Sequence, residues 1–458
     1  MHAVRLNISP DIELFELFQQ ISQQSWAMLL DSGNSDHVNA RYDLLVAEPV
    51  STLVTQGNTT TITDTASNKS ITSDDDPLNL LQRALGQHFS GSITPANLPF
   101  YAGAMGHFGY DLGRRFETLP VAAESPYITP DMAVGIYRWA IIKERSNGHI
   151  YLTGYSQQDL AQASEWETLA ANLVARKTAF RLTRPWQANM NEAQYSQKFN
   201  QVQDYLRAGD CYQVNLAQRF DASYEGDEWQ AFLALRRANN APFSAFIRLP
   251  ESAILSASPE RFLQVDNKRV ETKPIKGTRP NHHDAHKDAQ EIAQLQASEK
   301  DRAENLMIVD LLRNDLSKHC KPGSVKVPSL FAIETFPAVH HLVSTVTGEL
   351  ADNSHPLDLL RGAFPGGSIT GAPKIRAMQV IEELEPQRRN IYCGSIGYVS
   401  YHGHMDTSIT IRTLLCEQGK IYCWAGGGLV LDSAADSEYQ ETYHKVNKIL
   451  PVLENMGG

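Results

Sequence analysis

The stretch Phe243-Ser244-Ala245-Phe246-Ile247-Arg248-Leu249 opens a series of short strands that decides the fold class. Its odd-numbered residues are all apolar, so they share one face of a strand. Two more strands, 253–257 and 261–265, follow around Ser258-Pro259-Glu260. A further pair, 391–401 and 406–415, is joined by a turn that contains Gly403. Helices are predicted between these strands, at 288–315, 355–363, 373–385 and 434–454. Strands in runs, with helices interspersed rather than strictly alternating, predict an α+β protein with antiparallel sheets.

The N-terminal part of the chain shows the same mixture of elements. An amphipathic helix is predicted over 10–24, and the segment 44–63 has strand character. Between 156 and 190 the sequence becomes polar and glutamine-rich, and the strand pattern lapses. We therefore expect a division of the chain into an N-terminal region, 1–185, and a second region, 186–458. A surface excursion within one continuous fold is the alternative.

The composition excludes several classes of function. The chain of 458 residues carries 41 basic and 52 acidic side chains, and its charge of −11 argues against a general nucleic-acid or anionic-membrane binder. An anionic substrate must therefore be held by a local basic pocket or through a metal ion. The five cysteines include no Cys-x-x-Cys pair, which favours buried or inert thiols in a reducing compartment. With no secretory signal pattern and no apolar run of membrane-spanning length, the sequence predicts a cytoplasmic protein.

The segment Pro274-Ile275-Lys276-Gly277-Thr278-Arg279-Pro280 groups an amine, a hydroxyl and a guanidinium within a few residues. The two prolines restrict the backbone at both ends, and Gly277 lets the chain approach whatever Lys276 faces. A ligand with carboxylates would find an anchor in Arg279, a hydrogen-bond donor in Thr278 and a potential nucleophile in Lys276. The alternative is a solvated basic turn.

Two predicted helices present acids at the same spacing. Asp301 and Glu304 are three residues apart, as are Glu438 and Glu441, so each pair shares a helix face. If the helices face each other, four carboxylates converge with no histidine or cysteine near them in sequence. Oxygen ligands of this kind, completed by water and substrate, suit Mg²⁺. The alternative is that both pairs are solvated helix faces balanced by neighbouring basic residues.

Further features are candidates for ligand binding. Gly426-Gly427-Gly428 follows an apolar strand and exposes backbone N–H groups that can hold an oxyanion, with a tight bend as the alternative. Arg412 is predicted on the polar face of its strand, where a guanidinium can bind a carboxylate. His341 lies on an apolar strand face and is either a catalytic residue or a hydrogen-bonded core histidine. The glycines and hydroxyls of Phe364–Lys374 either hold a ligand or fix the loop against neighbouring strands.

Taken together, these segments resemble the chorismate-utilising enzymes, a family that includes anthranilate, isochorismate and salicylate synthases. The similarity covers roughly residues 190–455, with the motifs in the family's order. The segments that carry it are Lys300–Met307, His341–Ser344, Phe364–Lys374, Gly426–Gly428 and Glu438–Glu441. In the N-terminal part, Leu29–Ser32 and Phe108–Asp111 resemble the amino-transferring branch of the family.

Two positions distinguish the branches. Water-using members carry a lysine base where this chain has Gln213, which disfavours isochorismate or salicylate synthesis. Anthranilate synthases usually read Pro-Ile-Ala-Gly-Thr, whereas residues 274–278 read Pro-Ile-Lys-Gly-Thr. The lysine version resembles the branch that aminates chorismate at C4 in 4-aminobenzoate and folate biosynthesis. The resemblance therefore implies conversion of chorismate and ammonia to 4-amino-4-deoxychorismate.

The resemblance also implies a fold and a set of residue roles. The fold is a large core of two antiparallel sheets with helices packed outside and the active site between the sheets. Lys276 would attack C2 of chorismate, Glu260 would protonate the departing 4-hydroxyl, and His341 is a further catalytic candidate. The implied ligands of Mg²⁺ are Glu304, Glu441, Asp301 and Glu438. The implied substrate-binding residues are Gly277, Thr278, Ser368, Tyr392, Arg412, Gly426, Gly427, Gly428 and Lys445.

The resemblance further implies partners and a second ligand. None of the cysteines has the glycine-flanked context of a glutaminase nucleophile, so a separate glutamine amidotransferase subunit is expected to supply ammonia as part of a heterodimer. In anthranilate synthases the N-terminal motif binds tryptophan as a feedback inhibitor, so a bound L-tryptophan, structural or vestigial, is expected here. The matching residues are Ser32, Asn39, Ala40, Arg41, Tyr42, Pro242, Phe243 and Ser244.

Two other functions remain open. Anthranilate synthase component I shares every motif except Lys276, and the position of the amino group in the product, 2 or 4, separates the two reactions. A non-catalytic regulator of the same fold would bind chorismate or tryptophan without turnover. The intact set of Lys276, Glu260 and four acids argues against that regulator.

Overall fold

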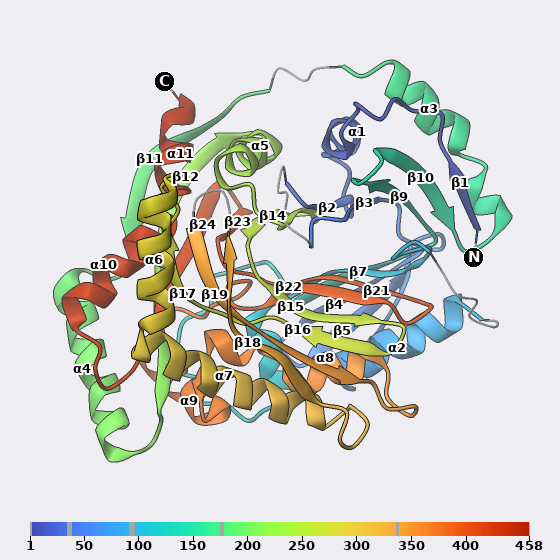
Figure 1. The fold of residues 1–458 in the computed structure, drawn as a ribbon. Coiled ribbons are helices and arrows are strands. Elements are labelled where there is room, and N and C mark those ends of the chain that lie inside the picture. The colour runs from blue at the N-terminus through green and yellow to red at the C-terminus, as the bar shows by residue number, and fades with distance from the viewer. Residues whose placement is uncertain (1, 34–38, 91–96, 175–177, 336–338, 458) are drawn as a thin grey trace.

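The computed structural model describes residues 2–33, 39–90, 97–174, 178–335 and 339–457, and it shows two large β-sheets with helices outside them (Figure 1). Within these ranges each sheet has 12 strands, and neighbouring strands of the sheets run antiparallel. The predicted α+β class with a two-sheet antiparallel core is confirmed.

The first sheet, sheet A, combines strands from both ends of the chain. In spatial order it contains β1 (His2–Arg5), β10 (His149–Gly154), β9 (Trp139–Glu144), β3 (Tyr42–Val46), β2 (Met28–Asp31), β13 (Phe243–Arg248), β14 (Ser252–Ser258), β23 (Thr413–Glu417), β24 (Lys420–Leu429), β12 (Gln213–Gly226) and β11 (Phe180–Ala188), with β20 (Gly371–Ala372) paired to β12. The late strands β23 and β24 therefore lie in its interior, between β14 and β12.

The second sheet, sheet B, is also built from distant segments. In spatial order it contains β17 (Ile275–Pro280), β19 (Val339–Glu349), β16 (Arg269–Thr272), β15 (Arg261–Asp266), β22 (Met405–Ile409), β21 (Ser395–Ser400), β7 (Gly103–Phe108), β8 (Met132–Tyr137), β4 (Ser51–Gln56), β5 (Thr59–Asp64) and β6 (Lys69–Ser73), with β18 (Lys326–Thr335) paired to β19. Both sheets thus take strands from either side of residue 185, and the division of the chain there stays a prediction.

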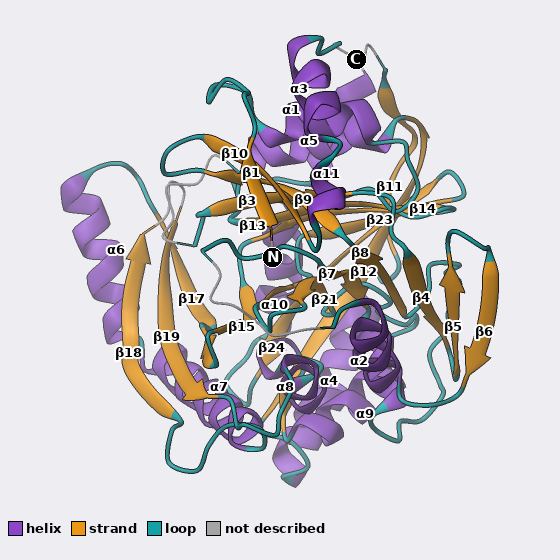
Figure 2. Cartoon of the chain, turned by 90° about the vertical axis from the view of Figure 1, so that its right-hand side faces the viewer, coloured by secondary structure: helices purple, strands orange, loops and turns teal. Residues whose placement is uncertain are grey.

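The helices lie outside the sheets, in the two groups visible at the top and the bottom of Figures 1 and 2. The upper group is α1 (Leu14–Ile21), α3 (Ala163–Ala171), α5 (Glu228–Asn239) and α11 (Leu450–Glu454). The lower group includes α2 (Pro77–His88), α4 (Glu192–Ala208), α7 (Glu299–Ser317), α8 (Pro356–Ala363) and α9 (Lys374–Leu384). Helices α6 (Ala285–Ala297) and α10 (Ala435–Val446) flank one end of the sheets. Of the helices in the described ranges, none combines the length and apolar character needed to cross a membrane.

Three apolar cores are found among the described residues, and the two largest hold the sheets and the upper helices together. The larger one lies between the sheets, where residues such as Ile254 of β14 and Leu263 of β15 are fully buried. The second one packs the outer face of sheet A against the upper helices, and the ring of Trp229 lies 5.0 Å from that of Phe18 and 5.1 Å from that of Phe246. Burial of such large rings is a major source of folding free energy. All five cysteines are buried and unpaired, as predicted.

Two of the predicted helices are each divided in the structure. The prediction of one helix over 288–315 is wrong because Ser298 ends α6 and caps α7, its Oγ accepting a hydrogen bond of 3.2 Å from the Asp301 N–H. The prediction of one helix over 434–454 is wrong because α10 ends at Val446 and a new helix, α11, starts with Pro451 in its first turn. Proline inside a continuous helix would remove a hydrogen bond and clash with the preceding turn.

Two strand predictions also need correction, and the structure decides the alternative left open for the basic segment. The polar stretch 156–190 does contain a strand, β11, which tolerates Pro185 and irregular register because it lies at the edge of sheet A. The predicted strand 406–415 is two strands, β22 in sheet B and β23 in sheet A, and the chain crosses between the sheets at 410–412. The basic segment 274–280 is an edge strand of sheet B, β17, rather than a turn.

Candidate active site

Lys276 and Thr278 lie on β17, at the edge of sheet B next to β19. Gly277 between them has φ +72°, and the pairing with β19 shifts by one residue at this point, which marks a bulge. A Cβ at Gly277 would lie 2.8 Å from Leu295 Cδ1 and 2.9 Å from Asp301 Cγ. Glycine is therefore required here both by the backbone conformation and by the close approach of α6 and α7.

Ser368 connects the predicted nucleophile to the predicted acid. This residue lies in a short 3₁₀ turn, η3 (Gly367–Ile369), between α8 and α9. The Lys276 amine donates a hydrogen bond of 3.2 Å to the Ser368 carbonyl, and the Ser368 hydroxyl donates one of 3.1 Å to Glu260 Oε1. Glu260 sits between β14 and β15 and is only 6% exposed. Ser368 thus contacts both the Lys276 amine and the Glu260 carboxyl group and holds them in one site.

Burial shifts the pKa of Lys276 and the pKa of Glu260 in opposite directions, each toward the uncharged form. It lowers the pKa of Lys276, although the nearby Glu304 and Glu260 raise it. Burial also raises the pKa of Glu260 to about 7, against the opposing effects of Lys276 and of the Ser368 hydrogen bond. Desolvation disfavours the charged form of each group. Burial therefore favours the neutral amine of Lys276 and the protonated carboxyl group of Glu260, the forms that a nucleophile and a general acid need.

His341 is buried on β19 and is hydrogen-bonded to the strand that carries Lys276. Its Nδ1 and the Thr278 Oγ1 share a hydrogen bond of 2.9 Å. The histidine is thus tied to a residue predicted to line the substrate site. Its role, catalytic or structural, stays a prediction.

The two acid-bearing helices, α7 and α10, approach each other beside β17. The Lys300 amine lies 3.8 Å from Glu438 Oε1, which joins the helices, and the Lys445 amine lies 2.7 Å from Glu441 Oε1. Burial raises the pKa of both Glu304 and Glu438, and the negative charge of Glu438 contributes to the rise at Glu304. These contacts bring the two acid pairs together, and their role, as metal ligands or as charges balanced by lysines, stays a prediction.

The donor chemistry of these acids fits a hard divalent cation, although Glu438 and Glu441 pair with lysines and Asp301 lies 3.4 Å from the Arg279 guanidinium. Among the described residues no group of three or more His, Cys, Asp or Glu side chains is spaced as metal ligands. Gly427 lets two of the acids approach β24 closely, because a Cβ there would lie 2.8 Å from Glu438 Oε2 and 3.6 Å from Glu441 Oε1. Carboxylates with room for water and substrate oxygens are the ligands that Mg²⁺ prefers.

The glycines 426–428 belong to β24 itself and pair with β12, so the alternative of a tight bend is wrong. Their backbone stays extended because β12 continues the ladder past the apolar residues. On the other edge, the pairing of β24 with β23 ends at Cys423. The glycine segment therefore has one edge that β23 does not cover, and the Lys445 amine donates a hydrogen bond of 2.8 Å to the Gly426 carbonyl.

Arg412 lies where the chain leaves sheet B for sheet A, with φ +51°, and not on a strand face as predicted. The pairing of β23 with β24 begins two residues later, at Leu414 opposite Cys423. Burial lowers the pKa of Arg412, and no carboxylate of a described residue pairs with it. A partly buried guanidinium of this kind favours a ligand carboxylate, since its own desolvation is uncompensated.

Tyr392 is buried in the chain segment that precedes β21. Its ring stacks on Trp424 of β24 at a centroid distance of 6.2 Å with an interplanar angle of 5°. Gln213, the residue that distinguishes this chain from water-using enzymes, is also buried, and its Nε2 lies against Gly428. The structure thus gathers the predicted catalytic, metal-binding and substrate-binding residues around β17, β24, α7 and α10.

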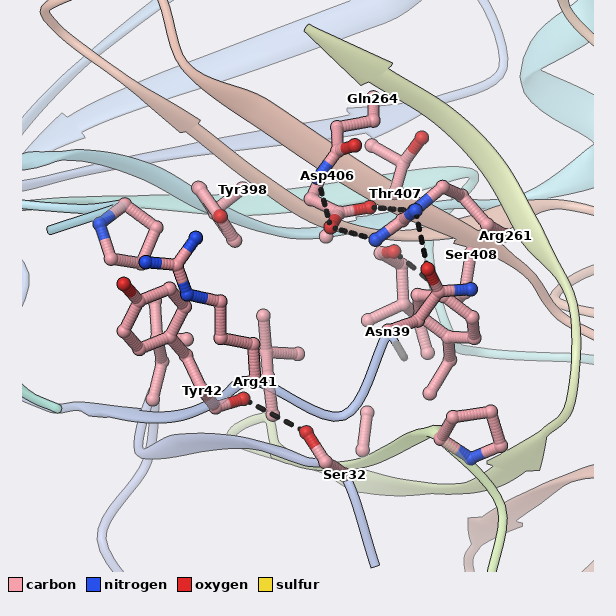
Figure 3. A pocket seen from close by; sticks show the side chains of 18 of the residues that line it. Ser32, Asn39, Arg41, Tyr42, Arg261, Gln264, Tyr398, Asp406, Thr407 and Ser408 are labelled. Atoms are coloured by element: carbon pink, nitrogen blue, oxygen red, sulfur yellow. Dashed lines mark hydrogen bonds and ion pairs between the residues drawn. The ribbon is translucent and has the colours of Figure 1, made fainter. Parts of the chain in front are cut away.

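A second site lies elsewhere, between sheets A and B. It is a cavity of about 290 Å³, and Figure 3 shows Ser32, Arg41 and Tyr42 facing Tyr398 and Asp406 across it. The residues matched to the tryptophan site that line it are Ser32, Asn39, Arg41, Tyr42, Pro242, Phe243 and Ser244. Ala40 does not line it.

Buried charges fix the N-terminal wall of this cavity. Asp31, at the end of β2, forms a bidentate ion pair with Arg236 of α5. Asp43 accepts a hydrogen bond of 2.7 Å from the Ser32 N–H, and burial together with Asp31 raises the pKa of Asp43 to about 6. These contacts hold the chain on both sides of Ser32 in one position.

The sequence analysis missed the wall that sheet B contributes. Arg261 on β15 forms an ion pair of 2.9 Å with Asp406 on β22, and its guanidinium also donates to Asn39 Oδ1 at 2.9 Å (Figure 3). The signal was present, because Asp406 is the one charged residue in β22, and Arg261 directly precedes the apolar pair Phe262-Leu263 of β15. It was not decisive, because the pairing of β15 with β22 joins segments far apart in sequence.

Comparison with known proteins places this geometry in a family. A family model described as chorismate binding enzyme matches residues 27–451. The chain is 56% identical, over 437 residues and 95% of each sequence, to aminodeoxychorismate synthase component 1 of Escherichia coli K12. It is 37% identical to the protein of the same name from Streptomyces lividans, over 93% of this chain and 90% of that one.

Solved structures are also similar to this chain. Anthranilate synthase component I from Streptococcus pneumoniae TIGR4 superposes with a TM-score of 0.80 at 31% identity, covering 91% of this chain and 93% of that one. MenF, the isochorismate synthase from Escherichia coli, superposes with a TM-score of 0.74 at 19% identity, covering 99% of this chain and 94% of that one. The second similarity concerns the fold alone.

Proposed function

The chain belongs to the family of chorismate-binding enzymes, and on that premise we propose that it converts chorismate and ammonia to 4-amino-4-deoxychorismate. This is the step that commits chorismate to 4-aminobenzoate and folate. The observation that carries the proposal is the connection of Lys276 to Glu260 through Ser368, because it joins a nucleophile to an acid beside the substrate site. The relatives called aminodeoxychorismate synthase component 1 support it.

In the proposed mechanism Lys276 attacks C2 of chorismate. The double bonds shift and the 4-hydroxyl leaves with the proton of Glu260, as water. Ammonia then attacks C4 and expels the lysine amine from C2, and the ionised Glu260 takes a proton from the new ammonium group. A positioned acid is worth roughly 10²–10⁴ in rate for such a poor leaving group. The lowered pKa of Lys276 and the raised pKa of Glu260 suit these two roles.

The remaining residues would hold the substrate. Mg²⁺, when bound, would neutralise the ring carboxylate, with Glu304 and Glu441 as its protein ligands and Asp301 and Glu438 in support. Arg412 would bind the enolpyruvyl carboxylate, since it has no carboxylate partner among the described residues. The other residues proposed to line the site are Gly277, Thr278, His341, Ser368, Tyr392, Gly426, Gly427, Gly428 and Lys445.

Ammonia is proposed to come from a separate glutamine amidotransferase subunit. All five cysteines of this chain are buried, and burial raises the pKa of each thiol, so none is suited to glutamine hydrolysis. The word component in the names of the relatives is consistent with such a partner.

The purified chain should aminate chorismate with ammonium at alkaline pH, where NH₃ is abundant, and should be inactive with glutamine. The measurement is incubation with chorismate and Mg²⁺, with the mass of the product and the position of its amino group determined. A 2-amino product would identify an anthranilate synthase instead. Binding of chorismate without any turnover would identify a non-catalytic regulator, and turnover with glutamine by the rigorously purified chain would contradict the need for a partner.

We propose L-tryptophan as the ligand of the second cavity, because seven of the eight residues matched to the tryptophan site line it. Saturating L-tryptophan should raise the thermal unfolding midpoint by about 2–5 °C, since a ligand at 100 times its Kd stabilises by roughly 2.7 kcal/mol. D-tryptophan is the control and should have no effect. Phe243→Ala removes a ring that lines the cavity and stacks on Arg261 at 5.2 Å, so it should weaken the shift. Equal shifts with both enantiomers would contradict the assignment.

A further inference from the structure

Arg389, in the loop between α9 and β21, is the second largest side chain that the fold buries completely, with 1% of it exposed. Its guanidinium forms a bidentate ion pair with Glu385, with nitrogen–oxygen distances of 2.6 and 2.9 Å. It also donates to two carbonyl oxygens, that of Ile369 at 2.9 Å and that of Asn215 at 2.8 Å. A cation this deeply buried is stable only when its donors are matched in this way.

These contacts join four segments at the back of the active site. Ile369 follows Ser368 in η3, Asn215 is two residues from Gln213 on β12, and the guanidinium lies 5.5 Å from the ring centroid of Tyr392. Glu385 is itself fixed, because the Ala217 N–H donates to its Oε1 at 2.9 Å. Nothing in the proposed mechanism uses Arg389, which is too deep to reach substrate through these neighbours.

We propose that Arg389 is a positioning residue of the reaction, which fixes Ser368 through the Ile369 carbonyl and thereby sets the position of Glu260 relative to Lys276. This inference rests on the proposed function. Ser368 is the natural target of such control, because its carbonyl accepts from the Lys276 amine and its hydroxyl donates to Glu260. A movement of η3 would therefore disturb both groups at once.

Only a guanidinium meets the geometry. Its five N–H donors lie in one plane and reach two carboxylate oxygens and two carbonyl oxygens in different directions. A lysine at 389 could pair with Glu385 but would leave the Ile369 carbonyl without its donor. The charge would be kept and the position of η3 would be lost.

The test compares Arg389→Lys with Arg248→Lys. Arg248 is also buried and paired with acids, Asp227 and Glu228, but it lies on β13 at the side of sheet A that faces α5. We expect kcat to fall at least about tenfold in Arg389→Lys, because small misplacements of reacting groups have large effects on rate. KM for chorismate should change by less than about threefold. Arg248→Lys should lower the unfolding midpoint to a similar extent while kcat stays within about twofold of the wild type.

The pH dependence separates positioning from a loss of stability. Glu260 faces Lys276, Lys445, Cys393 and the Ser368 hydroxyl, and the hydroxyl lowers its pKa. If η3 moves, that hydrogen bond is lost, the pKa of Glu260 rises, and the limb where the acid loses its proton shifts to higher pH. The ratio of variant to wild-type kcat should therefore increase above pH 7, because the ratio cancels the changing supply of NH₃. Ser368→Ala should show the same shift.

The outcomes are distinct. A fall in kcat no larger than that of Arg248→Lys, or a fall without the shift of the pH limb, would overturn the proposal. If Arg389→Lys does not fold, Glu385→Gln keeps Arg389 in place but weakens its anchor, and a smaller change of the same kind is expected. The ratios are measured on whichever aminated product the wild type forms, so a 2-amino product would contradict the proposed function without affecting this test.

Discussion

Lys276→Arg should lower the rate of 4-amination by on the order of 10³-fold or more, as expected for removal of a covalent nucleophile. Arginine keeps the positive charge but has no amine that can be deprotonated near neutral pH. A merely electrostatic role would tolerate the change. Position 276 stays buried in the variant. The substitution therefore removes the nucleophilic amine and keeps the surrounding site.

Lys276→Ala should also lose 4-amination, but it restores the Pro-Ile-Ala-Gly-Thr sequence and opens space at C2 of the substrate. Ammonia could then attack C2, so some 2-amino product is expected. Intact-protein mass spectrometry with chorismate and no ammonia should show an adduct on the wild type and none on Lys276→Ala. Peptide mapping should place the adduct on Lys276 and not on Lys445. Wild-type rates of 4-amination by the alanine variant would leave Lys276 as a pocket cation.

Glu304→Ala and Glu441→Ala should each abolish turnover at saturating Mg²⁺. EDTA should reversibly abolish the activity of the wild type. The charges of these acids have no other role that the fold requires, since both side chains are at least partly exposed. Their loss should therefore change the unfolding midpoint little. Asp310→Ala, an exposed acid on the same helix as Glu304, is the matched control and should keep its activity.

The metal hypothesis fails for either acid whose variant keeps near-wild-type activity. A direct readout is also available, because titration of the wild type with Mg²⁺ should raise the unfolding midpoint and the alanine variants should respond less. A variant that binds Mg²⁺ like the wild type but does not turn over would place that acid on the substrate instead.

The fold class and the main site motifs could be predicted from the sequence because they depend on local patterns. The acid pairs on α7 and α10 follow from helical spacing, and the alternation around Phe243 gives β13 and its neighbours. The break at Ser298 could also have been found, since serine is a strong N-cap residue. The basic stretch at 274–280 became a strand because β19 supplies its partner, which no local pattern encodes.

Features that depend on long-range pairing could not be predicted. Arg412 was expected on a strand face, yet the chain changes sheets at that residue, and only the partners of β22 and β23 decide this. The sheet-B wall of the second cavity, with Arg261 and Asp406, joins segments 145 residues apart. The network of Arg389 has the same origin, because its carbonyl partners lie on β12 and η3.

The interior position of the last strands has a consequence for biosynthesis. In sheet A, β14 and β12 are synthesised before β23 and β24, the strands that lie between them. In sheet B, β15 and β7 are likewise synthesised before β21 and β22. Neither sheet can close until almost the whole polypeptide has been made, so long apolar edges stay exposed during translation. We therefore expect folding to be slow and largely post-translational, and nascent or C-terminally truncated chains to depend on chaperones and to aggregate without them.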